Sequence, residues 1–92
     1  AVRRGRHGTI HHRVNERVKL RGERIAAIAR EHGLTRRESE VFALLARGRS
    51  IPYVRDALVI SRETAATHAK HIYAKLDVHS RQELIDMVAN GQ

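Results

Sequence analysis

Four hydroxyl residues divide the C-terminal two thirds of the chain, and they constrain its fold more than any other feature. Thr35, Ser50, Ser61 and Ser80 each precede a run of helix-forming residues. A side-chain oxygen at such a position accepts a hydrogen bond from an unpaired amide of the first helical turn. After the first and last of them, Glu38 and Glu83 follow three residues on, which is the pattern of a capping box. These caps predict four short helices between residues 35 and 90.

The apolar residues after each cap repeat at the helical period and do not alternate, so the sequence predicts an all-α domain. Gly48 and Asn90 are expected to end two of the helices, and Pro52 is tolerated in the first turn of a third. The residues expected to face inward are Val41, Phe42, Leu44 and Leu45 in the first helix, Val54, Ala57 and Leu58 in the second, and Leu84, Ile85 and Val88 in the fourth.

The segment before residue 34 has a different character. Residues 1–13 combine glycine, arginine and histidine with few apolar groups, which predicts a basic flexible arm. Residues 14–33 are expected to form an amphipathic linker helix with Val14, Val18, Ile25 and Ile28 along one stripe and Gly33 at its end. The compact domain is then expected over residues 34–92. The chain begins without methionine, which predicts a piece of a longer protein.

The charge indicates the kind of partner. The net charge is +8, and residues 1–34 hold 9 Lys/Arg against 3 Asp/Glu. Such an excess predicts a polyanionic partner, either nucleic acid or an anionic membrane surface, although a solvated tail would show it too. No stretch is apolar enough to span a membrane. The absence of cysteine excludes disulfides and thiol chemistry and is compatible with a cytoplasmic location.

The third predicted helix, about residues 62–76, has an unusual outer face. At 100° per residue, Ala65, Ala69, Ile72 and Leu76 gather in one sector, which predicts its core face. The opposite face is small and polar, without the long ion pairs typical of a surface that serves only solubility. A short helix, a tight turn and a capped second helix form a helix-turn-helix, whose second helix enters the major groove of DNA. Helical hairpins that bind only protein remain the alternative at this point.

The same residues resemble a known family. The segments LTRRESEVFALLARGRS, LVIS and TAATHAKHIYAKLDVHSRQEL are similar to the C-terminal DNA-binding domain of LuxR/GerE-type (NarL-like) transcription regulators. The resemblance covers residues 34 to about 88 without a gap. It implies a four-helix domain that binds double-stranded DNA as the output part of a transcription regulator.

The resemblance also implies contacts at particular positions. Base or groove contacts would fall at Ala66, Thr67 and Lys70. Contacts to phosphates would come from Thr35, Arg36, Arg62, Thr64, His71 and Lys75. A homodimer on an inverted-repeat operator would form through the fourth helix, with Leu84, Asp86, Met87 and Val88 at the contact. RNA polymerase is a further partner that such regulators can have.

The chain departs from the family pattern at two places. Ala65-Ala66 replaces the usual Val-Lys, so one cation expected on the recognition helix is missing. Ile51-Pro52-Tyr53-Val54-Arg55 replaces the usual Asn-Lys-Glu-Ile-Ala, and Arg55 is a candidate for a substitute phosphate contact. Similar text occurs in relatives that look like cytoplasmic tails of proteins with a membrane-embedded N-terminal part. The basic segment 1–30 would then be a juxtamembrane linker.

Other chemistry finds little support in the sequence. His7, His11 and His12 lie without a carboxylate or cysteine nearby, and His68 and His71 fit groove or packing positions better than a metal site. No nucleophile triad, phosphate loop or carboxylate pair appears, so we expect no enzyme, no metal and no cofactor. Glu38, Glu40 and Arg81 are candidates for an ion pair that ties the first and last helices together. A membrane- or protein-surface module and a sigma-factor-like region are the rival hypotheses.

Overall fold

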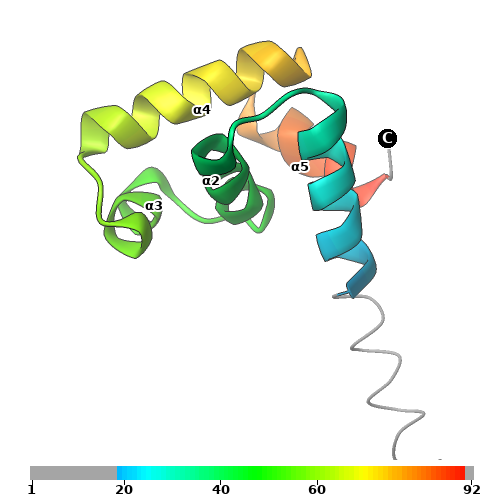
Figure 1. Cartoon of the computed structure of the whole chain (residues 1–92), viewed down its shortest axis with the longest axis horizontal. Coiled ribbons are helices and arrows are strands. Elements are labelled where there is room, and N and C mark those ends of the chain that lie inside the picture. Colours follow the sequence, from blue (N-terminus) through cyan, green and yellow to red (C-terminus); the bar gives the residue numbers. More distant parts are fainter. Residues whose placement is uncertain (1–18, 91–92) are drawn as a thin grey trace, which may run out of the picture.

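The part of the chain that the structure describes, residues 19–90 of a computed structural model, contains helices and connections only. A helical segment over residues 19–31 is followed by four further helices (Figure 1). These are α2 (Arg36–Ala46), α3 (Ile51–Leu58), α4 (Arg62–Leu76) and α5 (Arg81–Ala89). No strand occurs within these residues. The expected all-α fold class is therefore confirmed.

Hydroxyl caps start the helices where the sequence places them. Thr35 Oγ1 accepts from the Glu38 amide at 3.1 Å, and Glu38 Oε1 accepts from the Thr35 amide at 2.9 Å. Both halves of the capping box are thus present. The side chains of Ser50 and Ser61 each accept from the amide three residues on, at the starts of α3 and α4. The local sequence is therefore sufficient to set these three helix starts.

The cap of α5 differs from the prediction. Ser80 Oγ accepts from the Glu83 amide at 3.1 Å, as expected. The Glu83 carboxylate, however, accepts from the His79 amide at 3.1 Å, so the reciprocal bond to Ser80 is not made. Ser80 has φ −150°, against −69° for Thr35, so the backbone enters the two helices in different conformations. The expectation of a second capping box was wrong.

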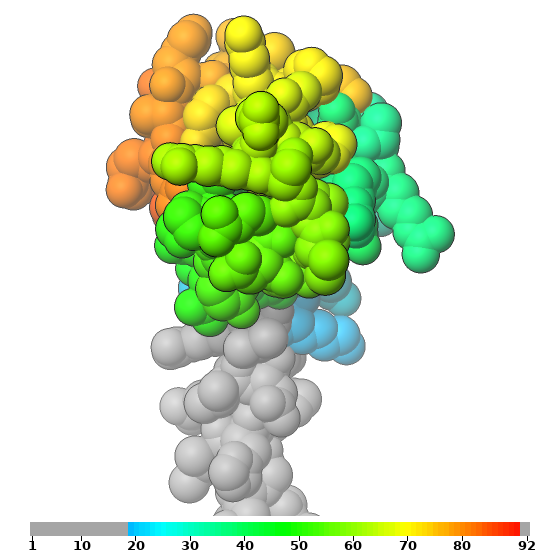
Figure 2. Space-filling view, turned by 90° about the vertical axis from the view of Figure 1, so that its left-hand side faces the viewer, coloured from blue at the N-terminus to red at the C-terminus, as the bar shows by residue number. Residues whose placement is uncertain are grey.

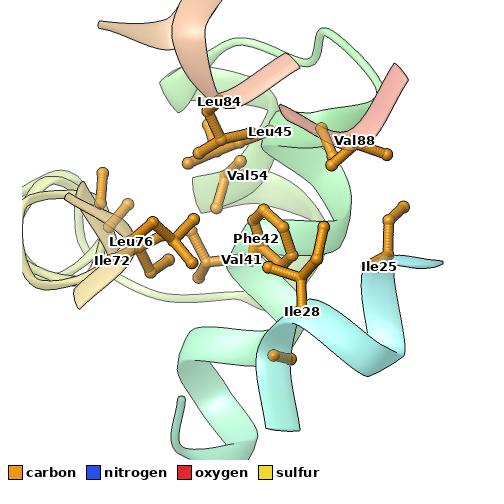
Figure 3. Close-up of a cluster of buried hydrophobic side chains, with 14 residues drawn as sticks. Ile25, Ile28, Val41, Phe42, Leu45, Val54, Ile72, Leu76, Leu84 and Val88 are labelled. Atoms are coloured by element: carbon orange, nitrogen blue, oxygen red, sulfur yellow. The ribbon is translucent and has the colours of Figure 1, made fainter. Parts of the chain in front are cut away.

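The core is organised around α2, which packs against α3, α4 and α5. Figure 3 shows Phe42 among buried side chains that come from several helices. Phe42, Leu45 and Val41 are all fully buried. Leu44, which was expected to face inward, is partly buried against the same cluster. The central position of α2 means that its residues fix where α3, α4 and α5 lie relative to one another.

The helical segment 19–31 belongs to the same core. Ile25, Ile28 and Ala29 are buried in one cluster with the residues of α2, α4 and α5. Gly33 follows with φ 68°, a conformation that glycine adopts without strain, and it ends the segment as predicted. Val14, Val18 and the proposed arm over 1–13 lie outside the described residues. The boundary proposed at residue 34 therefore separates two parts that share one hydrophobic cluster.

One inward residue of α3 was predicted wrongly. Val54 is fully buried and Leu58 is partly buried, but Ala57 is exposed. Ile51, Val54 and Leu58 fall on one stripe at 100° per residue, and Ala57 lies about 90° away from its centre. Because α3 contacts α2 and α4 along this narrow stripe, a residue beside it meets solvent.

Candidate nucleic-acid interface

The helix α4 lies along one edge of the molecule, with α2 and α3 beneath it (Figure 1). Its buried side consists of Ala65, Ala69, Ile72 and Leu76, the four residues predicted to form it. In Figure 2 the side chains of α4 stand above those of α3 at the top of the molecule, where they meet solvent. The helix therefore has one face anchored in the core and one face available for contact.

The solvent-exposed face of α4 consists mainly of short side chains and carries few charges. Ala66, Thr67 and Lys70, the residues expected to approach bases, are all exposed. Two of the three have side chains of three heavy atoms or fewer, so another molecule can come close to the helix axis there. Lys70 makes no ion pair or hydrogen bond with any residue between 19 and 90. Its ammonium group is thus available to an acceptor outside the chain.

The turn from α3 into α4 is tight and strained. Val59 has φ 54° and ψ 53°, the left-handed conformation, and its side chain is 88% exposed. This conformation is unfavourable for an L-residue, and more so for a β-branched one. Ile60 closes the turn by donating its amide to Arg55 O at 3.1 Å. The strained residue allows α4 to leave α3 after only three residues, which is the short connection that a helix-turn-helix requires.

The beginning of α4 presents hydroxyl and cationic groups. Ser61 Oγ accepts from the Thr64 amide at 3.0 Å and donates to Thr64 Oγ1 at 2.8 Å. The hydroxyl hydrogen of Thr64 therefore points to no partner within this cap and can donate to an external oxygen. Arg62, in the first turn, is exposed. These two residues, both predicted to contact phosphate, lie together at this end of the helix.

The other end of α4 lies against the start of α2. Lys75 Nζ donates to Glu38 Oε1 at 2.7 Å and to Gly33 O at 3.1 Å. His71 Nδ1 is 3.7 Å from Glu38 Oε2. Thr35, which caps α2, is bonded to the same Glu38. Three residues predicted as phosphate contacts (Thr35, His71 and Lys75) are thus brought together around Glu38. Arg36, the fourth, is exposed in the first turn of α2.

Glu38 is the one buried charged side chain among the described residues, with 6% of its side chain exposed. The hydrogen bond from the Lys75 ammonium, followed by the bond from the Thr35 amide, holds the pKa of this carboxyl below its usual value, although burial opposes the shift. Glu38 is therefore ionised at neutral pH. A buried carboxylate in this state requires Lys75 to remain beside it.

The two groups of phosphate-type residues are separated by most of the length of α4. A helix rises about 1.5 Å per residue, so Arg62 and Lys75 are about 20 Å apart along the axis. The exposed small residues lie between them. The major groove of DNA is about 12 Å wide and is bordered by phosphates on both sides. A groove of this width admits a helix, and the cations of α4 lie at the two ends of its exposed face.

The predicted ion pair between the first and last helices is not present. Glu38 pairs with Lys75 of α4, and Glu40 pairs with Arg37 of its own helix at 2.9 Å. Arg81 makes no ion pair within residues 19–90, and its buried Nε has no hydrogen-bond partner in the structure. The prediction was wrong because the Glu38 carboxylate lies beside Lys75 of α4 and the Glu40 carboxylate lies beside Arg37.

Sequence reasoning also missed a link between α2 and α3. Arg37 Nη2 donates to Leu58 O at 3.0 Å, while its Nη1 binds Glu40. The acceptor is a carbonyl at the end of α3, where helical carbonyls lack an intrahelical partner. No local pattern signals this contact, because the two residues are 21 positions apart. Arg37 thus supports the helix that precedes the turn into α4.

Two of the four residues predicted for the dimer contact lie in the core. Leu84 is fully buried and Val88 is 2% exposed, so both belong to the core. Of the other two, Asp86 is exposed and Met87 is partly buried. Leu84 and Val88 were predicted both to face the core and to form the dimer contact. A side chain that is buried in the core of its own chain is not available to a second chain. A contact through α5 would have to use its outer residues.

Metal binding finds no support within the described residues, where no group of three ligand-type side chains comes together. His68 is half-buried and His71 is exposed, and neither lies in such a group. His7, His11 and His12 lie outside the described residues. Between residues 19 and 90, no helix combines the length and the apolar character that crossing a bilayer requires.

The fold and this site define a helix-turn-helix DNA-binding domain. Residues 32–88 match the family model "Bacterial regulatory proteins, luxR family". The match covers more than half of the chain, and the chain therefore belongs to this family, as its sequence motifs indicated.

Relatives agree with the family. The chain is 46% identical over 55 residues to the uncharacterized response regulatory protein YgeK of Escherichia coli, covering 60% of this chain and 37% of the relative. It is 39% identical over 61 residues to the transcriptional regulatory protein DegU of Brevibacillus brevis, covering 65% and 26%. It is 39% identical over 59 residues to the transcriptional activator protein ExaE of Pseudomonas putida, covering 64% and 28%. No solved structure gives a significant match.

The chain thus spans well under half the length of these relatives. The family and the relatives support DNA-binding transcription regulation, with double-stranded DNA as the partner. They also confirm the expectation of a regulator that is not an enzyme.

Proposed function

We propose that the chain recognises a specific sequence in double-stranded DNA with α4 in the major groove. The observation that carries this proposal is the exposed strip of small and polar residues on a helix whose opposite side is fully anchored in the core. Residues that suit phosphate contacts lie toward both ends of this strip, with Arg62 and His71 about 14 Å apart along the helix axis. Because the helix is already folded and packed, it can approach base edges without a further loss of backbone conformational entropy.

Each exposed residue has a chemical role in this proposal. Lys70 donates to the acceptor atoms of guanine, O6 and N7. Ala66 and the methyl group of Thr67 contact thymine methyl groups. Arg62 and Thr64 bind phosphates at one border of the groove, while Thr35, Arg36 and His71 do so at the other. Most of the affinity then comes from phosphate contacts, and discrimination comes from the three central residues.

We further propose that two copies bind an inverted-repeat operator as a homodimer. The burial of Leu84 and Val88 removes these side chains from the contact. Asp86 and Met87 remain on the accessible side of α5, next to Gln82, which donates to Asp86 Oδ1 at 2.9 Å. We expect the chains to associate on DNA and to be monomers in its absence.

Selection of bound duplexes from a random pool tests the proposal directly. We expect the chain to enrich one motif, with two half-sites in inverted orientation. A competition assay at about 150 mM salt then compares the enriched duplex, a random duplex and anionic vesicles. If no motif is enriched, or if vesicles compete better than either duplex, the chain is a membrane- or protein-surface module.

Lys70→Ala tests the role of α4 within the same assay. We expect it to weaken binding to the enriched duplex by about 1–3 kcal/mol and to relax the preference at one base position. Lys19→Ala is the matched control, because it removes one exposed lysine charge at the far end of segment 19–31 from α4 (Figure 1). If Lys70→Ala and Lys19→Ala weaken binding by the same amount, on the enriched and on the random duplex alike, then Lys70 contributes only its charge and does not read a base.

A further inference from the structure

The two ends of α4 hold their cations differently. Arg62, in the first turn, is exposed and makes no ion pair or hydrogen bond within residues 19–90. Lys75, in the last turn, is bonded to Glu38 at 2.7 Å and to Gly33 O at 3.1 Å. Two of the three donors of its ammonium group are therefore in use. Lys75, which the family resemblance assigns to a phosphate, therefore already has its partners within the chain.

The ion pair between Lys75 and Glu38 is costly to break. The side chain of Glu38 is only 6% exposed, so little water reaches the carboxylate while Lys75 lies beside it. A buried carboxylate left without its cation costs far more than an exposed one, because charges in the interior are poorly screened. A phosphate that drew Lys75 away would have to compensate for this loss. Exposed cations such as Arg62 bind phosphate without such competition.

The same contacts form a rigid connection between two elements. Glu38 is bonded through the capping box to Thr35, at the start of α2. Lys75 therefore joins the last turn of α4 to the first turn of α2 through a single buried side chain. Through its bond to Gly33 O, Lys75 also holds the connection between segment 19–31 and α2, which passes beside this end of α4 in Figure 1. The far end of α4 has no comparable charged link among the described residues.

We propose that Lys75 and Glu38 act as a positioning pair for DNA recognition. Their contact sets the depth and angle of α4 relative to the phosphate-facing residues at the start of α2. Lys75 then contributes to base discrimination through the placement of α4, and its charge is not one that neutralises a phosphate. This inference rests on the proposed function of α4 and revises the role that the family resemblance implies for Lys75.

Glu38→Gln separates the two roles of Lys75 by the sign of its effect. Glutamine also serves in a capping box, so the start of α2 is retained. The substitution removes one negative charge, which raises the net charge by one, and it frees Lys75 from its ion pair. If Lys75 acts as a phosphate cation, Glu38→Gln binds both the enriched and the random duplex as tightly as the parent, or more tightly. If the pair positions α4, we expect the preference for the enriched duplex to fall about tenfold, as for one mismatched base pair.

Lys75→Met and Arg62→Met provide the matched comparison. Each removes one cation from one end of α4 and keeps a long apolar stem. We expect Arg62→Met to reduce the salt dependence of binding by about one unit in log–log slope per chain. We expect Lys75→Met to leave this slope unchanged and to reduce the preference for the enriched duplex about tenfold. All binding is measured on the full chain, well below the melting midpoint of each variant.

Several outcomes overturn the positioning pair. One is a Lys75→Met slope that falls as it does for Arg62→Met. Another is a loss of thermal stability in Glu38→Gln and Lys75→Met with the duplex preference intact, which assigns the pair to folding alone. If Lys75→Met does not fold, Glu38→Gln decides the matter. A parent chain that enriches no motif defeats the proposed function itself, and this result is distinct from all of these.

Discussion

The strained turn residue Val59 offers a test of how the helix-turn-helix is built. Replacing Val59 with glycine removes a left-handed conformation that costs an L-residue about 1–2 kcal/mol. About 0.5–1 kcal/mol of this gain is offset, because glycine makes the unfolded chain more flexible and so raises the entropy lost on folding. The Val59 side chain is 88% exposed, so little buried apolar surface is lost. We therefore expect Val59→Gly to stabilise the fold by about 0.5–1 kcal/mol, or roughly 2–8 °C in the melting midpoint of a domain this small.

Urea and thermal unfolding followed by circular dichroism measure this change. Ala74→Gly is the matched control, because Ala74 is exposed and helical, in the last turn of α4. There glycine should destabilise the chain by about 1 kcal/mol. Opposite signs for the two glycine substitutions would support the strain argument. A Val59→Gly chain that is no more stable than the parent, while Ala74→Gly behaves as expected, would refute it.

Three further predictions concern stability. Because the Glu38 pKa is lowered in the folded state, its stabilisation is complete above its usual value of 4.5 and is lost as the pH falls below that value. Glu38→Gln should therefore flatten the acid side of a plot of unfolding free energy against pH, and an unchanged slope would contradict this. Phe42→Ala should cost about 3–5 kcal/mol, read as a large fall in melting midpoint, because Phe42 is fully buried at the centre of the core. Ser61→Ala should cost about 1 kcal/mol in urea unfolding through the lost cap of α4, and a cost near zero would mean that water replaces the cap.

The positioning pair bears on how relatives of this chain could differ. The recognition residues of α4 can change without affecting the fold, because they are exposed and bonded to nothing else within residues 19–90. Glu38 and Lys75 cannot change independently, since each is the main partner of the other. If the pair sets the placement of α4, then specificity depends on two separable features: which residues α4 carries, and how far it enters the groove.

The sequence by itself was sufficient for the helices and for the buried and exposed sides of α4. The caps at Thr35, Ser50 and Ser61 and the stop at Gly33 depend on hydrogen bonds and backbone angles within three or four residues, so local patterns reveal them. The small outer face of α4 is equally local, because helical periodicity assigns each residue to a side. Family membership followed from the same motifs.

Only the tertiary structure decided which side chains meet across helices. Lys75 and Glu38 are 37 positions apart, and nothing in either segment distinguishes a lysine that binds a buried carboxylate from one that awaits a phosphate. The same holds for Arg37 and the carbonyl of Leu58, which are 21 positions apart. Long side chains of either charge satisfy the helical pattern equally well, and their partners are chosen by the packing of α2 against its neighbours.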